Sequence, residues 1–369
     1  MEETKKLKKS KKRIIISALL IVLTLSAVLL FAFADKIFAQ SQGEIADISE
    51  IPFSYESGTL QSFELAGDGL AVVSSSSAQL FDASGTSAAK RIVSFGSPAV
   101  SASRHGALFF DIGSRNCFIM NLNGEIKDLD VSGSIISANM NDSGYITVIT
   151  EEAGYKALVS VYDSNLDELY RWYSGSGYAI KAVVAPDGRH FAVLSITAQG
   201  SEIHIFAFTS ETERGRIKYD NLLLLDFYFM GNSQICAIGE GGFYFSNTKG
   251  EDVGSFGFGG MHICDYSFDS TDFAAVFLSA YRNGAGGKLL TVSAEGTRLG
   301  EIDIEKDVVS MSSIGRSLLV MSPAGLILYS RELNVQREVS TLMTSQSALL
   351  RPRGDVLLSS SFTSEIFKF

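Results

Sequence analysis

The sequence predicts an all-β fold. It consists of a single β-propeller of eight four-stranded blades, preceded by one transmembrane helix. Three observations support this prediction. A hairpin of two short apolar strands recurs eight times at a spacing of about 40 residues, no convincing amphipathic helix follows the N-terminal region, and an uncharged apolar run precedes the repeats. Seven blades is the alternative, which applies if a weaker repeat such as MSSIGRSLLVM does not form a blade.

The N-terminal region has the composition of a membrane anchor. Residues 1–13 carry seven Lys or Arg and two Glu, and the run from Ile14 to Phe33 has no charge. A helix of about 20 residues spans about 30 Å, the thickness of the hydrocarbon core. The sequence therefore predicts a basic cytoplasmic tail (1–13), a transmembrane signal-anchor (14–34) and a linker (35–50). Cleavage after the small-x-small pattern Ala32-Phe33-Ala34 is the alternative.

The charge distribution indicates where the rest of the chain lies and which partners it avoids. Because basic flanks stay in the cytoplasm, residues from Asp35 onward are predicted to be extracytoplasmic, in a single-pass protein of the cell membrane. The tail contributes +5 to the formal net charge of −10, which leaves −15 for residues 14–369. This acidic body is repelled by phosphate backbones and anionic lipid, so neither nucleic acid nor adhesion to the membrane surface is expected.

The repeating hairpin has a short apolar strand, a polar turn and a second apolar strand. The eight copies read FELAGDGLAVVS, SASRHGALFFD, ANMNDSGYITVI, VAPDGRHFAVLS, YFMGNSQICAIG, YSFDSTDFAAVFL, MSSIGRSLLVM and LLRPRGDVLLS. Their second strands begin at Ala71, Ala107, Tyr145, Phe191, Ile235, Phe273, Ser317 and Val356, so successive starts lie 36 to 46 residues apart. Third and fourth strands follow with turns rich in Asn, Asp, Ser and Gly, as in CFIMNLNGEIKDLDV.

The two ends of residues 51–369 are predicted to close the ring. The last repeat supplies only three strands before Phe369, and the apolar segment IPFSYES (51–57) is left over before the first repeat. Pairing of strand 51–57 with the C-terminal blade would complete that blade and cover exposed sheet edges.

One hairpin supports a resemblance to known propellers. The segment PDGRHFAV, Pro186 to Val193, resembles the Pro-Asp-Gly hairpin of the broad WD40-like, YVTN and TolB-type superfamily. The WD dipeptide is absent. The whole layout of basic tail, anchor and acidic propeller is similar to uncharacterised signal-anchored propeller proteins of Gram-positive bacteria such as clostridia. That resemblance implies a location and a fold, and no activity.

The sequence shows little sign of catalytic chemistry. Its four histidines have no metal-ligand spacing, there is no G-x-S-x-G nucleophile elbow, and Cys117, Cys236 and Cys264 form no C-x-x-C pair. We therefore predict no catalytic residue, no metal and no cofactor. No disulfide framework is expected either, although one pair could bridge in an oxidising compartment.

Loop lengths point to one face of the propeller as a binding surface. The links between second and third strands are longest in EEAGYKA, TAQGSE and AYRNGAGGK, and they share a face with the connections YSGSGY and FGFGGMH. The candidate binding residues on this face are Tyr155, Trp172, Tyr178, His262, Tyr281 and Arg282. The alternative is that these aromatic residues end strands and pack between blades.

Two function classes follow from these observations. The first is a membrane-anchored, extracytoplasmic, non-catalytic binding or scaffold module that engages an envelope protein or a wall polymer. The second is an extracytoplasmic glycan hydrolase or lyase with carboxylates at the central channel. Two acidic side chains in one concave pocket would favour the enzyme.

Overall fold

The computed structural model describes residues 53–268, 272–281 and 286–369. The predicted tail, anchor and linker lie outside the described residues, as does the candidate Arg282. Within the described ranges, the structure has no helix with the length and apolar character needed to cross a bilayer.

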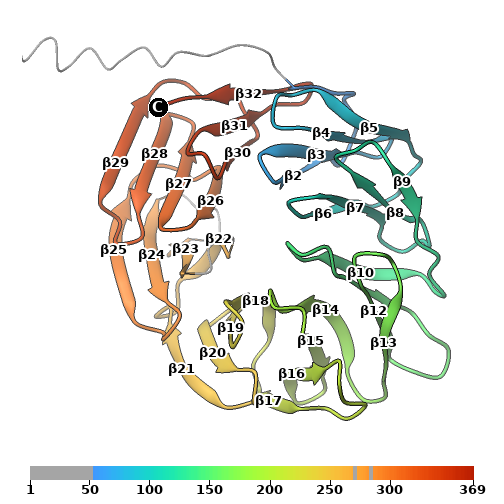
Figure 1. The fold of residues 1–369 in the computed structure, drawn as a ribbon. Coiled ribbons are helices and arrows are strands. Elements are labelled where there is room, and N and C mark those ends of the chain that lie inside the picture. The colour runs from blue at the N-terminus through green and yellow to red at the C-terminus, as the bar shows by residue number, and fades with distance from the viewer. Residues whose placement is uncertain (1–52, 269–271, 282–285) are drawn as a thin grey trace, which may run out of the picture. The chain divides into compact units, whose positions relative to one another are not determined.

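The described strands form eight four-stranded antiparallel sheets that stand as blades around a central axis (Figure 1). Blades 1 and 2 comprise β2 (Ser62–Ala66), β3 (Gly69–Val73), β4 (Ser77–Phe81), β5 (Ser87–Ile92), β6 (Pro98–Ala102), β7 (Gly106–Asp111), β8 (Cys117–Asn121) and β9 (Ile126–Asp128). Blades 3 and 4 comprise β10 (Ile135–Met140), β11 (Ile146–Thr150), β12 (Ala157–Tyr162), β13 (Glu168–Ser174), β14 (Tyr178–Val184), β15 (His190–Thr197), β16 (Gly200–Ala207) and β17 (Gly215–Asp220).

The second half of the ring repeats this arrangement. Blades 5 and 6 comprise β18 (Leu224–Met230), β19 (Gln234–Gly239), β20 (Gly242–Asn247), β21 (Asp252–Gly257), β22 (His262–Ser267), β23 (Phe273–Ser279), β24 (Gly287–Ser293) and β25 (Arg298–Ile304). Blades 7 and 8 comprise β26 (Ser310–Ile314), β27 (Ser317–Ser322), β28 (Gly325–Ser330), β29 (Val335–Ser340), β30 (Ser347–Leu350), β31 (Val356–Ser359), β32 (Thr363–Phe367) and β1 (Phe53–Ser54). The eight-blade prediction is confirmed, and the seven-blade alternative is wrong.

The predicted hairpins coincide with the first two strands of each blade. Every second strand begins within two residues of its predicted start. In the Pro-Asp-Gly turn, Gly188 has a φ of +64°, which disfavours any residue with a side chain. An added Cβ would also lie 2.9 Å from the ring of Tyr145 in blade 3, so a glycine is needed for close blade packing as well.

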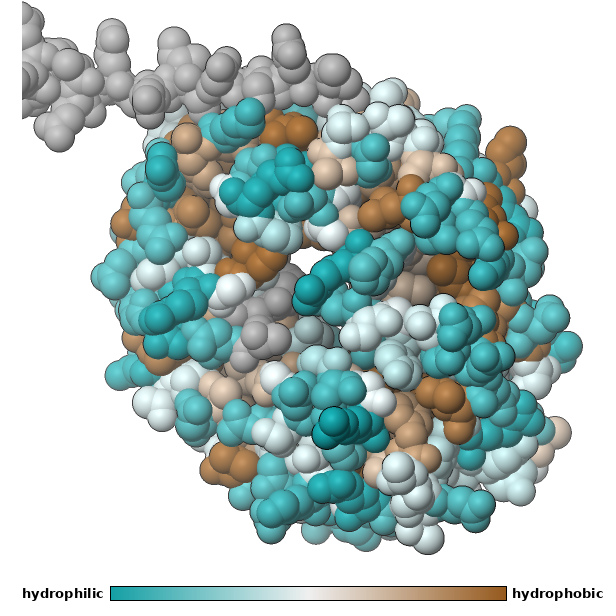
Figure 2. Space-filling view, in the orientation of Figure 1, coloured by the Kyte–Doolittle hydropathy of each residue, from teal (hydrophilic) through white to brown (hydrophobic). Residues whose placement is uncertain are grey.

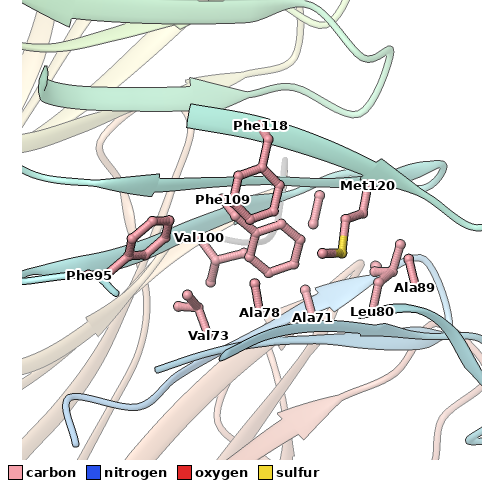
Figure 3. Close-up of a cluster of buried hydrophobic side chains, with 12 residues drawn as sticks. Ala71, Val73, Ala78, Leu80, Ala89, Phe95, Val100, Phe109, Phe118 and Met120 are labelled. Carbon is pink, nitrogen blue, oxygen red and sulfur yellow. The ribbon is translucent and has the colours of Figure 1, made fainter. Parts of the chain in front are cut away.

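The core lies between neighbouring blades, because each sheet buries both faces of its middle strands. In the cluster between blades 1 and 2, Phe109 and Phe118 pack against Val73, Ala78 and Leu80 (Figure 3). The two phenylalanine rings stack with centroids 5.6 Å apart. Full burial of one such side chain contributes about 1.5–3 kcal/mol to stability. The fourth strands β9 and β29 are mostly exposed, as expected for the outer edge of a blade.

Inner strands of adjacent blades are joined by hydrogen bonds one repeat apart in sequence. The backbone N–H of Ala102 donates to Oε2 of Glu64 at 2.7 Å, and that of Met140 donates to Oγ of Ser101 at 3.0 Å. The N–H of Ser313 likewise donates to Oγ of Ser267 at 3.1 Å. These bonds satisfy donors on the channel-facing edge, which has no neighbouring strand. They explain why the inner strands contain small polar residues.

The two ends of the described chain meet in blade 8. Strand β1 pairs antiparallel with β32, with Phe53 opposite Ser364. Within the described residues this strand ends at Ser54, before the end predicted at residue 57. Tyr55 lies beyond it and donates its hydroxyl to the Ser360 carbonyl at 2.8 Å. A side-chain contact also crosses this seam, because buried Arg351 in blade 8 donates to the carbonyl of Asp68 in blade 1 at 2.9 Å.

Candidate functional site

The loops of the propeller form two chemically different faces. We call the connection face the one with the loops between second and third strands and between successive blades. The hairpin face has the loops between first and second and between third and fourth strands. Exposed large apolar side chains occur in the loops of the connection face: Leu60, Ile112, Tyr155, Leu223, Tyr281, Val309, Leu342 and Phe362. None occurs in the described loops of the hairpin face.

The hairpin face instead has ion pairs between loops of adjacent blades. Arg353 in blade 8 lies 2.8 Å from Asp68 in blade 1, and Arg104 in blade 2 lies 3.2 Å from Asp142 in blade 3. Figure 2 looks along the axis onto the hollow at the centre of the ring and shows hydrophilic side chains over much of the surface around it. Exposed ion pairs of this kind stabilise a protein by at most about 1 kcal/mol.

Three tyrosines and a lysine gather on the connection face between blades 3 and 4. We call Tyr155, Lys156, Tyr173 and Tyr178 the aromatic cluster. The rings of Tyr155 and Tyr173 have centroids 4.7 Å apart, and Nζ of Lys156 lies 4.9 Å from the ring centroid of Tyr178. The same Nζ donates to the Tyr178 hydroxyl at 3.3 Å. All four side chains are exposed, so this arrangement offers flat aromatic surface together with hydroxyl groups and one cation.

The local sequence explains why these side chains face solvent. Tyr155 and Lys156 follow Gly154, which has a φ of +84° in the loop between β11 and β12. Tyr173 and Tyr178 flank the short connection between β13 and β14. Tyr155, Tyr178 and the loops that hold them were predicted. Tyr173 and Lys156 were missed, although both are next to predicted candidates and alternation in β13 places Tyr173 on the opposite side from Trp172.

The prediction of a long loop is wrong for one of the three links. The TAQGSE link of blade 4 is a tight turn, because β15 extends to Thr197 and β16 begins at Gly200. The β-branched residues Ile196 and Thr197 favour the extended strand. Blade 4 therefore contributes little loop surface to the connection face through this link.

Trp172 lies between blades and is separate from the exposed surface. Its half-buried ring is 5.0 Å from the ring of His204 and 5.2 Å from that of Phe206, both on β16 of blade 4. This is the packing role that the sequence left as the alternative. This contact holds β13 in place. Tyr173, the residue after Trp172 in that strand, belongs to the aromatic cluster.

The other described candidates belong to blade 6. His262 begins β22, directly opposite Ser279 in β23, and the backbone N–H of Tyr281 donates to Oγ of Ser279 at 3.1 Å. Both residues therefore lie at the connection-face end of blade 6, and the ring of Tyr281 is exposed. Blade 6 is separated from the aromatic cluster by blade 5. The candidates thus form two groups on one face.

A polar network that was not predicted joins the inner strands of blades 4, 5 and 6. Nζ of Lys181 lies 2.5 Å from Oδ1 of Asp226, and the hydroxyl of Tyr266 donates to Oδ2 of the same carboxylate at 3.0 Å. Burial, followed by the negative charge of Asp226, raises the pKa of Tyr266 well above its ordinary value. Tyr266 therefore stays protonated and acts as a hydrogen-bond donor. This network ties three blades together around the channel.

The channel carboxylates are engaged by the protein itself. Glu64 accepts a hydrogen bond from the N–H of Ala102, and Asp226 is bound by Lys181 and Tyr266. Among the described residues, no group of three His, Cys, Asp or Glu side chains has a geometry suited to a metal ion. The three cysteines are free thiols, and burial raises the pKa of Cys117 to about 12. Cys117 and Cys236 are buried, and Cys264 is exposed.

A buried histidine and its carboxylate partners lie beneath Trp172 in blade 4. Nδ1 of buried His204 is 2.7 Å from Oε1 of Glu213, and Nε2 is 3.5 Å from Oε2 of Glu202. Arg216 also binds Glu213, with its NH2 group 2.6 Å from Oε2. Burial raises the pKa of Glu213, but hydrogen bonds from His204 and Arg216 outweigh it and hold the pKa below its usual range.

We expect Glu213 to stabilise the propeller in a pH-dependent way. Because its pKa is lowered by folding, its contribution is present above the unfolded-state value of about 4.5 and is lost as the pH falls through the folded-state value. Glu213→Gln should therefore lower the urea midpoint at about pH 7 and have a smaller effect near pH 4. Asp220→Asn, an exposed position in β17 of the same blade, is the control and should leave the midpoint unchanged. An equal loss at both pH values would contradict the assignment.

Comparison with solved structures shows the same fold in proteins of very different sequence. The C-terminal WD40 domain of Sif2 is 12% identical, with a TM-score of 0.61 over 86% of this chain and 97% of that chain. BamB from Moraxella catarrhalis is 11% identical, with a TM-score of 0.54 over 86% of this chain and all of that chain. The computationally designed Ika8 protein is 8% identical, with a TM-score of 0.60 over 86% and 98% of the two chains. At these identities the likeness concerns the fold alone.

The sequence comparisons place the chain in a family. No curated protein matches the chain significantly. Residues 44–338, which include most of the propeller, match a family described as "Family of unknown function (DUF5711)". With a match over most of its length, the chain belongs to the DUF5711 family.

Proposed function

We propose that this protein is a single-pass membrane protein whose propeller lies outside the cytoplasm and acts as a non-catalytic binding module. The connection face presents the binding surface, and the partner is another protein of the cell envelope. The basic tail and the uncharged run of residues 14–33 support the anchor. The layout also resembles that of signal-anchored propellers of Gram-positive bacteria.

The observation that carries the proposed binding role is the chemical difference between the two faces. The described loops of the hairpin face lack exposed large apolar side chains, whereas those of the connection face have several. Tyrosine, serine and glycine dominate the segment YSGSGY beside the aromatic cluster. Protein-binding loops favour this composition, because tyrosine supplies large contact area at low entropic cost and small polar residues supply adaptable hydrogen bonds. The cluster is therefore the expected centre of the interface.

Site-directed crosslinking in intact cells tests both parts of the proposal. In a Cys264→Ser background, single cysteines replace Ala153, beside the aromatic cluster, and Tyr281 on the connection face, and Ser143 and Asn232 on the hairpin face. A membrane-impermeant maleimide should label all four sites in intact cells if the propeller is extracytoplasmic. A crosslinker should then capture one envelope protein from the connection-face sites alone. Alanine at Tyr178 should reduce capture from the Ala153→Cys site by about tenfold, the effect of an interface hot spot of more than 1 kcal/mol.

Other outcomes would contradict specific parts of the proposal. Labelling only after permeabilisation would place the propeller in the cytoplasm. Equal capture from both faces, or capture from neither, would remove the connection face as the binding surface. Capture of a wall polymer in place of a protein would identify the partner class as glycan.

A further inference from the structure

A second exposed apolar surface lies on the connection face where the ring closes. Three side chains form it, and we call Leu60, Leu342 and Phe362 the seam patch. Their exposed fractions are 63%, 86% and 63%. None of these side chains has a hydrogen-bonding group, in contrast to the tyrosines of the aromatic cluster. The seam patch is therefore suited to an apolar environment and not to a polar partner surface.

The three side chains come from loops that meet at one residue. Nε2 of Gln61 donates to the carbonyl of Ser361 at 3.1 Å, and Nε2 of Gln346 lies 2.9 Å from Oγ of the same serine. Gln61 follows Leu60, Gln346 lies in the loop of Leu342, and Ser361 precedes Phe362. These bonds join the loops before β2, before β30 and before β32. Next to Leu342, the N–H of Met343 donates to the carbonyl of Pro323 in blade 7 at 3.0 Å, so the loop of Leu342 is held at both ends.

The backbone at Leu60 supports a functional role for this surface. Leu60 has a φ of +56°, in the left-handed region that is unfavourable for a residue with a branched side chain. At Leu333 the same kind of conformation places a leucine in the core, where burial compensates for it. At Leu60 the side chain points to solvent and gains no such packing. Strain of this kind is concentrated at binding and functional sites.

The seam patch is also nearly free of charge. Across residues 55–61, 341–346 and 360–362, the only charged residue is Glu56. Its carboxylate forms an ion pair with Lys90 at 2.5 Å. The acidic body as a whole repels anionic surfaces, but this repulsion is screened over about 8 Å at physiological salt. It therefore does not prevent an uncharged patch from contacting lipid.

The patch lies beside the point where the described chain begins. The described chain begins at Phe53, and two residues later the N–H of Tyr55 donates to the carbonyl of Phe362 at 3.0 Å. The uncharged apolar run ends at Phe33, and residues 34–52 can span at most about 65 Å when fully extended. An anchor in residues 14–34 would thus be joined to the propeller at its seam, so the seam is the part of the ring with the shortest tether to the bilayer.

We propose that the seam patch inserts its apolar side chains into the interfacial region of the bilayer and so fixes the orientation of the propeller. This inference rests on the anchored topology proposed above. Exposed leucine and phenylalanine side chains insert at such interfaces, and covalent attachment to the anchor makes even a weak contact effective. With the seam edge on the membrane, the ring tilts, and the aromatic cluster on the opposite side of the ring is left free for a protein partner.

Fluorescence quenching in reconstituted vesicles tests this orientation. Full-length protein with Cys264→Ser and Thr344→Cys, labelled with an environment-sensitive dye, is placed in vesicles of phosphatidylcholine with a minor share of phosphatidylglycerol. Thr344 is exposed in the loop of Leu342 and leaves the patch intact. Brominated lipid should quench this dye. The matched reporter Ser176→Cys, exposed on the connection face between blades 3 and 4, should not be quenched. The double change Leu342→Ser and Phe362→Ser should abolish quenching at position 344 without altering the thermal unfolding midpoint.

The possible outcomes test the proposed orientation of the propeller separately from the proposed membrane anchor. If carbonate washing leaves the protein in the vesicles but neither reporter is quenched, the anchor stands and the orientation is refuted. Equal quenching at 344 and 176 would mean that the whole face lies on the lipid, which also refutes a patch confined to the seam. Release of the protein by carbonate would refute the anchor, and with it the inference that depends on it.

Discussion

Replacing Arg351 by methionine is expected to lower the free energy of unfolding by about 3–5 kcal/mol, the cost of breaking a buried ion pair. Only 1% of Arg351 is exposed. Its guanidinium binds Asp355 through two bonds of 2.6 and 2.5 Å, and it also donates to the carbonyls of Asp68 and Ala83 at 2.9 and 3.1 Å. Methionine leaves a buried carboxylate and two carbonyls without their donor. Urea unfolding at neutral pH measures the loss.

Two further variants test this explanation. Arg353→Met removes the pair with Asp68 on the hairpin face, where almost half of the arginine side chain is exposed, and should cost less than about 1 kcal/mol. Adding Asp355→Leu to Arg351→Met removes the unpaired carboxylate and should recover part of the lost stability. A similar small loss in both single variants would show that Arg351 does not hold the seam between blades 8 and 1.

Deleting residues 359–369 is expected to abolish cooperative unfolding of the propeller. The deletion removes β32, which lies between β31 and β1 and is the strand on which the start of the ring pairs. It also removes buried Phe367 and exposes both Phe53 and the edge of β31. We expect a loss of more than about 5 kcal/mol, comparable with the whole stability of a small domain. Circular dichroism during thermal unfolding provides the measurement.

The control for this truncation is a shorter one. Deleting residues 368–369 leaves every residue of β32 in place and should preserve a single sharp transition. If the longer deletion also unfolds cooperatively at a similar temperature, the ring does not depend on closure by β32. Each blade would then be stabilised mainly by its own neighbours, as in an open repeat array.

The architecture was largely predictable because the repeated hairpin is a local signal. Glycines such as Gly188 mark turns that need a positive φ, and the alternation of short apolar strands between them specifies blades without any long-range information. The prediction of a long loop at TAQGSE was wrong because it also relied on local sequence alone. Turn composition alone does not show how far the flanking strands extend before they turn.

The candidate site was predictable only in part. Loops that carry aromatic residues can be recognised in the sequence, and Tyr155 and Tyr178 lie on the expected face. The sequence does not show which aromatic rings meet, so Trp172 was grouped with them although it packs on His204, and Tyr173 was missed. Whether a side chain beside a turn faces solvent or the next blade depends on strand twist and blade spacing.

The sequence by itself determined the number of blades and the order of their strands, because periodicity depends on residues close together in the chain. Only the tertiary structure decided which residues meet across blades. Arg351 reaches carbonyls more than 260 positions away, and the seam patch joins loops from both ends of the propeller. Such contacts arise when the ring closes, and closure brings together residues whose sequence separation carries no local pattern.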